Sequence, residues 1–445
     1  MTHILAWIGA GNRAGMVLPA AIILVTYGAI MSERVNRAVA ALLGAGLTVA
    51  SGLLTQDQAI AAIDWNTLAL LAGTMIIVGV AKKSGLFGYV AIRAAQAVKA
   101  HPGAILAALA LVTAAFSALL NNVTTVLLIV PVTFVICGEL KVPVYPFLFA
   151  EIFASNIGGT ATLIGDPPNI LIGSAVRLSF DDFVLNLAPV VLAVFAVQTL
   201  LMHLIWGAHM KAAPDERARV MAMHPRDFIG DPRLLRWSVL VIVLVIAAFV
   251  FARQIRMEPG SIAMLGAAVL MFLDNLPRHR HRHAEAVSAA FHEVEWIAIF
   301  FFIGLFVVIG GVKQAGILDL LARQLLASTG GNLKLTAEGV LWASALLSAI
   351  VDNIPFVATM IPMVKSMAPA LGGEHAILPL WWALSLGACL GGNGTLIGAS
   401  ANLTVAGIAE KSGVRFSFFT FTALALPLML IDVAIAHAYV VWRYF

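Results

Sequence analysis

Charged side chains are scarce in this sequence. Asp, Glu, Lys and Arg together make up 11% of the 445 residues, whereas about a quarter of the residues of soluble proteins are charged. This deficit disfavours a soluble enzyme with a water-filled cleft, and the net charge of +4 disfavours a nucleic-acid partner. The only two cysteines, Cys137 and Cys389, lie in separate apolar runs, so a secreted disulfide scaffold is also disfavoured.

Apolar residues are abundant instead. They form 61% of the chain, with a mean hydropathy of +0.96. A membrane-spanning helix needs roughly 20 mostly apolar residues, and the sequence offers about ten such stretches. We therefore expect an all-α polytopic membrane protein in contact with the lipid bilayer. Residues 207–234, which are rich in Pro, Lys and Arg, are expected to form a cytoplasmic linker.

The two sides of this linker repeat each other. WNTLALLAGTMIIVGVAKKSG, which starts at Trp65, aligns without gaps on WIAIFFFIGLFVVIGGVKQAG, which starts at Trp296. Internal repeats are common in secondary transporters, whose substrates bind at the repeat interface near the bilayer midplane. We predict a first repeat over residues 1–206 and a second over 235–445, each with five spans. Because five is odd, the second repeat would be inverted relative to the first.

The positive-inside rule orients this arrangement. With the linker in the cytoplasm, most of the 27 Lys and Arg residues fall on the cytoplasmic side. We therefore predict a multi-pass protein of the cytoplasmic (inner) membrane with both termini extracytoplasmic.

Four polar interruptions break the apolar pattern at membrane depth, where polar groups are costly and unwound backbone must line a cavity or be buried. Two would be tips of re-entrant hairpins, at about 104–137 and 339–366. Two would be breaks in helices, at about 146–173 and 378–407. The predicted helix-break residues are Gly158, Gly165, Pro167, Pro168, Asn169, Gly391, Gly394, Gly398 and Asn402.

Polar groups at these interruptions would converge on one substrate site, because freed backbone groups and half-helix ends point at a common centre. The predicted substrate-binding residues are Asn121, Asn122, Thr124, Asn156, Gly159, Thr160, Thr162, Asn353, Gly392, Asn393 and Thr395. Asp166 and Asp352 are the candidates for proton or cation coupling, since a buried carboxylate can carry a proton near neutral pH. The alternative for each acid is a structural helix or hairpin cap.

The strings NNVTT, GGTATLIGDPPN and GGNGTLIG resemble the ion transporter superfamily. This superfamily includes arsenite permeases, sodium/proton antiporters, the P protein and sodium-coupled dicarboxylate and citrate carriers. The resemblance covers nearly the whole chain. It implies an elevator-type carrier, in which the hairpins and broken helices slide as a transport domain against a scaffold. A channel with a static filter is the contrasting alternative.

The hairpin tips depart from those of the dicarboxylate carriers, which resemble each other in a Ser-Asn-Thr motif. Here the tips contain Asn121-Asn122-Val123 and Asp352-Asn353-Ile354, and none of the four motifs contains Lys or Arg. Two acids would repel a dianion. We therefore expect proton-coupled export of arsenite or antimonite, the arsenical-resistance branch of the superfamily. The alternatives are sodium/proton antiport and, ranked lower, organic-anion transport.

Other features carry less weight. Cys389 lies close to the second Gly-Gly motif, but a small buried apolar role is favoured, and Glu151 is interpreted as interfacial. Residues 277–283 alternate Arg with His, and the arginines oppose a metal cation, so neither a metal nor a cofactor is expected. The chain is expected to be a homodimer or a monomer. The resemblance to arsenite permeases allows a cytoplasmic ATPase subunit as partner.

Overall fold

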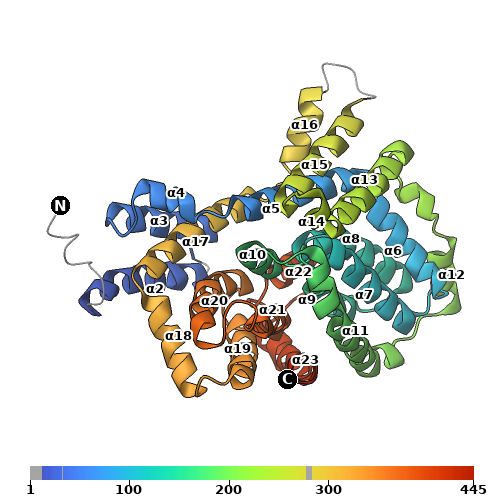
Figure 1. Cartoon of the computed structure of the whole chain (residues 1–445). Helices are drawn as coiled ribbons and strands as arrows, with labels where there is room; N and C mark the ends of the chain where they lie inside the picture. Colours follow the sequence, from blue (N-terminus) through green and yellow to red (C-terminus); the bar gives the residue numbers. More distant parts are fainter. Residues whose placement is uncertain (1–12, 33, 277–282) are drawn as a thin grey trace.

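The computed structural model describes residues 13–32, 34–276 and 283–445, and the regular structure of these ranges is entirely helical (Figure 1). Residues 1–12 lie outside the described ranges, as does residue 33. The predicted location of the N-terminus therefore stays a prediction. Most of the Arg/His tract at 277–283 is outside them as well.

Among the described residues before the linker, a short 3-10 helix (Arg13–Met16) is followed by a series of ten α-helices. The third long helix, α5, starts at the first repeat motif, and α7 to α10 contain the first hairpin and the first broken helix. The helices are α2 (Val17–Met31), α3 (Arg37–Ala50), α4 (Gln56–Ala62), α5 (Trp65–Lys83), α6 (Leu86–Ala97), α7 (Pro102–Leu119), α8 (Asn122–Leu140), α9 (Tyr145–Thr160), α10 (Pro167–Val176) and α11 (Phe180–Ile205).

From the second repeat motif onward, the helices of the second series are similar in length to their counterparts in the first series. Its helices are α13 (Pro232–Val250), α14 (Ala252–Ile255), α15 (Pro259–Asn275), α16 (His283–Phe291), α17 (Trp296–Gln314), α18 (Ile317–Ser328), α19 (Leu333–Ser348), α20 (Asn353–Met367), α21 (Leu378–Gly391), η6 (Gly392–Gly394), α22 (Ser400–Lys411) and α23 (Phe418–Tyr444). The inverted relation of the two series stays a prediction.

The linker is folded rather than extended. It contains the short helix α12 (Pro214–Ala222), and α13 begins a little earlier than predicted because Asp231 caps it at Pro232. Arg219 Nε donates to Glu139 Oε2 at 3.1 Å, and Gln96 Nε2 donates to the carbonyl of Met223 at 2.7 Å. Polar contacts therefore hold the linker against α6 and α8.

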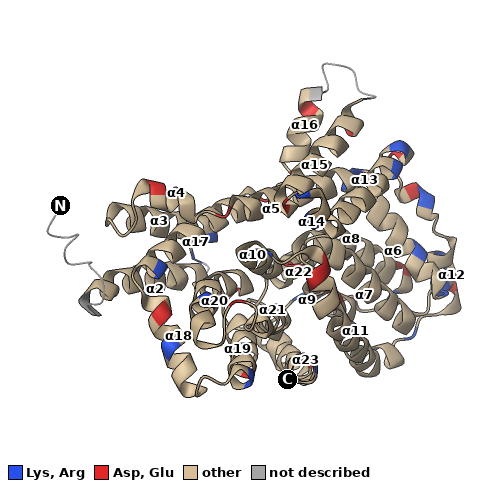
Figure 2. Ribbon diagram, in the orientation of Figure 1, with Lys and Arg blue, Asp and Glu red and all other residues tan. Residues whose placement is uncertain are grey.

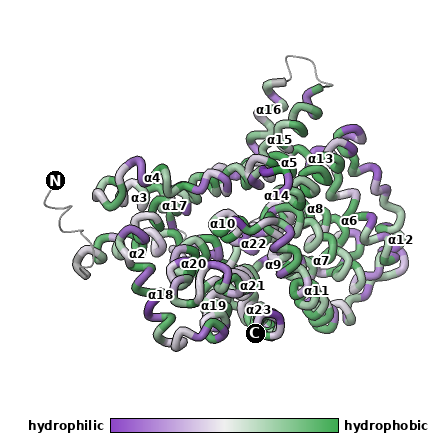
Figure 3. Tube along the Cα trace, in the orientation of Figure 1, coloured by the Kyte–Doolittle hydropathy of each residue, from purple (hydrophilic) through white to green (hydrophobic). Residues whose placement is uncertain are grey.

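Seven of the described helices are long and apolar enough to cross a membrane. They include α7 and α8, the two arms of the first predicted hairpin, so length alone does not separate re-entrant arms from spans. Apolar residues dominate the inner helices, and hydrophilic ones gather on outlying helices such as α12 and α18 (Figure 3). The charges follow the same distribution (Figure 2), as expected of a chain immersed in lipid.

The two halves exchange their early helices. Helix α3 of the first half packs along α17 of the second, and α15 of the second half packs along α5 of the first. Both pairs are close because a glycine faces the neighbouring backbone. A Cβ on Gly73 would lie 2.6 Å from the carbonyl carbon of Ala263, and one on Gly304 would lie 2.5 Å from that of Ala41.

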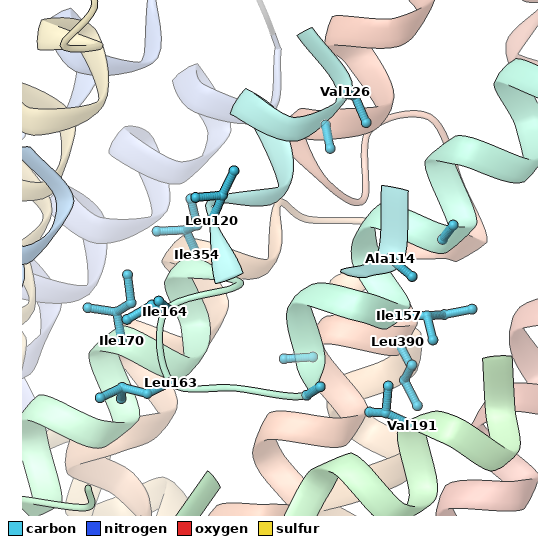
Figure 4. Packing of buried hydrophobic residues seen from close by; sticks show 14 of the residues in the cluster. Ala114, Leu120, Val126, Ile157, Leu163, Ile164, Ile170, Val191, Ile354 and Leu390 are labelled. Atoms are coloured by element: carbon cyan, nitrogen blue, oxygen red, sulfur yellow. The ribbon is translucent and has the colours of Figure 1, made fainter. Parts of the chain in front are cut away.

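The hairpins and the broken helices form the interior, with α7 against α9, α19 against α21, and α9 against α21. Glycine again sets the separation, since a Cβ on Gly158 would lie 2.2 Å from the carbonyl oxygen of Ala114. Apolar side chains from both halves fill the surroundings, among them Ile157 of α9 and Leu390 of α21 (Figure 4).

The exchanged helix pairs predict a large cost for added volume. Gly73→Ala and Gly304→Ala should each destabilise the protein by about 1–3 kcal/mol, because the methyl group has no space. Thermal unfolding in detergent measures this loss, with the reaction of the buried thiols as the signal that the protein has unfolded. Gly46→Ala in α3 is the control. A Cβ there meets nothing within 4 Å, so it should be neutral or slightly stabilising. Equal melting temperatures for all three variants would contradict the prediction.

Candidate functional site

Two asparagines satisfy the backbone at the helix breaks. Asn169 Nδ2 donates to the carbonyls of Thr160 and Thr162, at 3.0 and 2.9 Å, across the break between α9 and α10. Asn402 Nδ2 donates to the carbonyls of Gly392 and Thr395, at 2.7 and 2.8 Å, across the break between α21 and α22. Both asparagines are fully buried. Each amide thus replaces hydrogen bonds that the interrupted helix cannot make.

Asn156 joins the two breaks at the centre of the molecule. Its Nδ2 donates to Asn393 Oδ1 and to Asn402 Oδ1, both at 2.9 Å. Its Oδ1 accepts from Asn122 Nδ2 at 3.1 Å. A hairpin tip, the first broken helix and the second broken helix therefore meet in one buried amide network. Asn393 Nδ2 is buried within this network without a hydrogen-bond partner.

The hairpin tips are capped by their own side chains. Asn121 Oδ1 accepts from the amide of Val123 at 2.9 Å, and Asp352 Oδ1 accepts from the amide of Ile354 at 3.0 Å. The backbone amide of Asn122 donates to the carbonyl of Gly165 at 3.1 Å. The first hairpin tip is thus joined directly to the first break, and Asn121 has a structural role in this conformation.

Three of the predicted threonines use their hydroxyls within the protein. Thr162 Oγ1 donates to the carbonyl of Ala118, and Thr395 Oγ1 donates to that of Ala349, both at 2.5 Å. These bonds brace each break against the hairpin beside it. Thr160 Oγ1 donates to the carbonyl of Asn156, four residues earlier in the same helix, at 2.7 Å.

Asp166 carries the carboxylate at the centre of the site. Its side chain is 1% exposed, and both of its oxygens lie 3.5 Å from Asn353 Nδ2. Its other polar interactions are with the side chains of Asn122 and Cys389. Asp166 occupies the N-cap position of α10 but makes no side-chain capping bond. Its carboxylate is turned toward the second hairpin rather than toward its own helix.

Asp352 has a partner that the four motifs do not reveal. Arg37, the first residue of α3, places its Nη1 3.4 Å from Asp352 Oδ2 and 2.6 Å from Ser400 Oγ. Ser400 Oγ also donates to Asp352 Oδ2 at 3.0 Å. None of the four motifs contains Lys or Arg, but α3 brings Arg37 to the site from outside the motifs. One signal was present in the sequence, namely an arginine at the start of an apolar run.

A small cavity lies where these groups meet. Its volume is about 20 Å³, which is room for about one water molecule. The predicted residues Asn121, Asn122, Asn353 and Asp166 line it, together with Arg37, Glu295 and Ser400, which were not among the predicted site residues. Asn156 and Asn393 reach the same centre through hydrogen bonds. Thr124 does not line this cavity but faces a neighbouring vestibule of about 540 Å³.

The predicted glycines and prolines shape the breaks, and of these residues Pro167 also lines the cavity. Pro167 and Pro168 start α10, where their missing amides cost nothing. A Cβ on Gly165 would lie 2.5 Å from the carbonyl of Gly159, and one on Gly398 would lie 2.6 Å from that of Gly392. In both halves, two stretches of backbone therefore cross at distances that only glycine allows.

Cys389 and Glu151 both make polar contacts that the sequence analysis did not predict. Cys389 Sγ lies 3.6 Å from Asn169 Oδ1, and its thiol interacts with Asp166. Glu151 is fully buried inside α9 and accepts a hydrogen bond from Thr133. In the structure, Glu151 lies in the interior of the helical core, not at its edge.

Long apolar helices, two interrupted helices and a buried polar network between them define a multi-pass membrane transporter. The chain belongs to the CitMHS citrate transporter family, whose model matches residues 27–387. This agrees with the broad resemblance to the ion transporter superfamily inferred from the sequence motifs.

The chain is similar over nearly its full length to several curated proteins, two of which are named as transporters. It is 42% identical to an uncharacterized transporter of Mycobacterium tuberculosis, covering 96% of this chain and 99% of that protein. It is 30% identical to an uncharacterized transporter of Synechocystis, covering 94% and 95%. It is 32% identical to the P protein of Mus musculus, covering 97% of this chain and 61% of that protein.

Two solved structures share the fold. The YdaH transporter of Alcanivorax borkumensis matches with a TM-score of 0.61 and 15% identity, over 86% of this chain and 87% of that one. MtrF of Neisseria gonorrhoeae, described as illuminating a class of antimetabolite efflux pumps, matches with a TM-score of 0.57 and 13% identity, over 99% and 97%. At these identities the likeness concerns the fold alone.

The braced breaks predict that Thr395 is structural. Thr395→Val removes the donor to Ala349 and the acceptor for the amides of Ile397 and Gly398. It should lower the free energy of unfolding by about 1–3 kcal/mol, since buried partners lose their hydrogen bonds. Thr404→Val is the control, because that hydroxyl only bonds the carbonyl of Ser400 within α22. Denaturation of both variants in the same detergent makes the comparison, and equal stabilities would rule out the brace.

Proposed function

We propose that this chain is a secondary active transporter that exports arsenite or antimonite, as neutral trivalent hydroxides, in exchange for protons. The observation that carries the proposal is the Asp166 carboxylate, which is 1% exposed and surrounded by amides and a thiol at the meeting point of hairpins and breaks. Burial in such surroundings favours the protonated acid. A proton can therefore be taken up on one side of the membrane and released on the other.

Cargo recognition would rely on hydrogen bonds rather than charge. Asn122, Asn353 and Asp166 line the cavity, and amides offer both donors and acceptors to a small trigonal hydroxide. Asn393 Nδ2, buried without a partner, is a further donor at the centre. Tight ligation of arsenic by several thiolates would hinder its release from the carrier. At this site a single thiol, that of Cys389, interacts with Asp166.

The transport step would move the hairpins and broken helices as one body. Asn156 and the hydroxyls of Thr162 and Thr395 join these elements to one another. The pairs formed by α3 with α17 and by α15 with α5 would be the stationary scaffold. This division supports an elevator mechanism of alternating access over a static channel filter.

Sodium/proton antiport is the second candidate. The cavity of about 20 Å³ matches a single small ion more closely than a larger solute, and carboxylate and amide oxygens are suitable ligands for a hard cation. In that case Asp166 would bind sodium and protons in turn, without another cargo.

Organic-anion transport, the activity for which the family is described, fits the charges less well. Asp166 and Glu295 line the cavity, and Arg37, which also lines it, is already bonded to Asp352. A multiply charged carboxylate would therefore meet more negative than positive charge.

Proton flux in sealed vesicles of purified protein distinguishes the three cargoes. With an imposed pH gradient, the addition of arsenite should cause a proton flux across the vesicle membrane. The addition of sodium chloride or of citrate should cause none. Protein-free vesicles are the control for leak. Flux driven by sodium alone would replace the proposal with antiport, and flux driven by citrate alone would replace it with organic-anion transport.

Asp166→Asn should abolish proton-coupled flux, because the amide cannot take up or release a proton. The loss should be at least about 100-fold if Asp166 is the obligatory carrier, while arsenite binding by the folded protein is retained. Asp57→Asn, at an exposed position in the first turn of α4, is the matched control and should transport normally. Wild-type pH dependence in Asp166→Asn would remove the residue from the coupling step.

A further inference from the structure

The small cavity has a large neighbour on one side. The vestibule of about 540 Å³ lies between the second half of α5, the first turns of α8 and the segment leading into α17. Lys82 and Glu293, which form an ion pair of 3.3 Å with side chains 51% and 30% exposed, mark its open part. Its inner part and the cavity have Arg37, Met75 and Glu295 in common. The vestibule and the cavity are therefore neighbours that meet at these three side chains.

Arg37 lies between two carboxylates that belong to different groups of helices. One is Asp352 at the tip of the second hairpin, 3.4 Å from Arg37 Nη1. The other is Glu295, the N-cap residue of α17, whose charge interacts with that of Arg37. Because α3 packs along α17, Arg37 and Glu295 are carried by the same helix pair. Asp352 and Ser400 are carried by the hairpin and the broken helix.

We infer that the vestibule is the cytoplasmic entrance to the cavity and that Arg37 gates it by exchanging Asp352 for Glu295 when the hairpin moves. The ion pair with Asp352 belongs to the conformation seen here, with the vestibule open. Departure of the hairpin removes Asp352 and Ser400 from Arg37, and Glu295 then keeps the guanidinium paired. Without that second carboxylate, each transport cycle would leave a partly buried cation, 28% exposed in this conformation, without a partner.

The sidedness of the inference rests on the linker being cytoplasmic, and the gate refines the proposed carrier function. Its test needs no cargo, so a failure of the arsenite assignment leaves the result interpretable. The reporter is Thr124→Cys, because Thr124 lines the vestibule but not the cavity. The native cysteines are 2% and 0% exposed, so the wild-type protein serves as the blank.

Accessibility tests the entrance. A charged, membrane-impermeant methanethiosulfonate should modify Thr124→Cys in inside-out vesicles and not in right-side-out vesicles. Ser174→Cys is the matched control. It lines a different cavity, of about 660 Å³, beside the opposite end of α5, and should react only in right-side-out vesicles. Modification of Thr124→Cys from the extracytoplasmic face, or from neither face, would overturn the entrance.

Labelling rates test the gate. Asp352→Asn in the Thr124→Cys protein should slow modification several-fold, because the open conformation loses its ion pair. Glu295→Gln should not slow it, because this change removes the partner used in the other conformation. A merely structural role would give both variants the same effect. Equal slowing, or no effect of Asp352→Asn, would refute the exchange.

Arg37→Lys gives the final check. It keeps the charge and should retain most of the wild-type labelling rate, whereas Arg37→Ala should behave like Asp352→Asn. The double variant Arg37→Ala/Asp352→Asn should be no slower than either single variant, because both changes break the same pair. Additive slowing in the double variant would show that Arg37 and Asp352 act separately.

Discussion

Satisfying the backbone of interrupted helices is the constraint on which this structure depends. Inside a bilayer, a carbonyl without a donor costs several kcal/mol, yet the protein contains two breaks at its centre. Asn169 and Asn402 resolve this by donating to two carbonyls each. Their Oδ1 atoms then accept from Ser385 and from Asn156 of the opposite half. The groups that keep the breaks folded thus also hold the halves together.

The polar side chains of this network differ in how they are used. Thr162, Thr395 and Asn121 use their side chains for hairpins and breaks. Asp166 differs because its carboxylate does not cap its helix and forms no ion pair with a described residue, and both of its oxygens lie 3.5 Å from Asn353 Nδ2. This loosely bonded, buried acid is the feature on which the proposed coupling to a proton or an ion rests.

Much of this arrangement follows from the sequence alone. The Gly-Gly and Pro-Pro patterns at Gly158, Pro167 and Gly391 predict the breaks, because these residues interrupt helices wherever they cluster. Asn122, Asn353 and Asp166 were placed together because paired motifs in the two halves imply a common centre. Arg37 could not be placed, since its contact with Asp352 arises from helix exchange between halves, which no local pattern encodes. The hydroxyl roles of Thr162 and Thr395 depend on hairpin carbonyls that are equally distant in sequence.

The exchange of early helices has a consequence for biosynthesis. Helix α5 acquires its closest neighbour, α15, only after the linker and α13 have been made, and α3 waits still longer for α17. Gly73 of α5 leaves room there for the backbone of Ala263 in α15, and Ala41 of α3 is later approached by Gly304 of α17. The first half therefore enters the bilayer with two unmatched helix faces, so the insertion machinery or lipid must cover them until translation of the second half completes the fold.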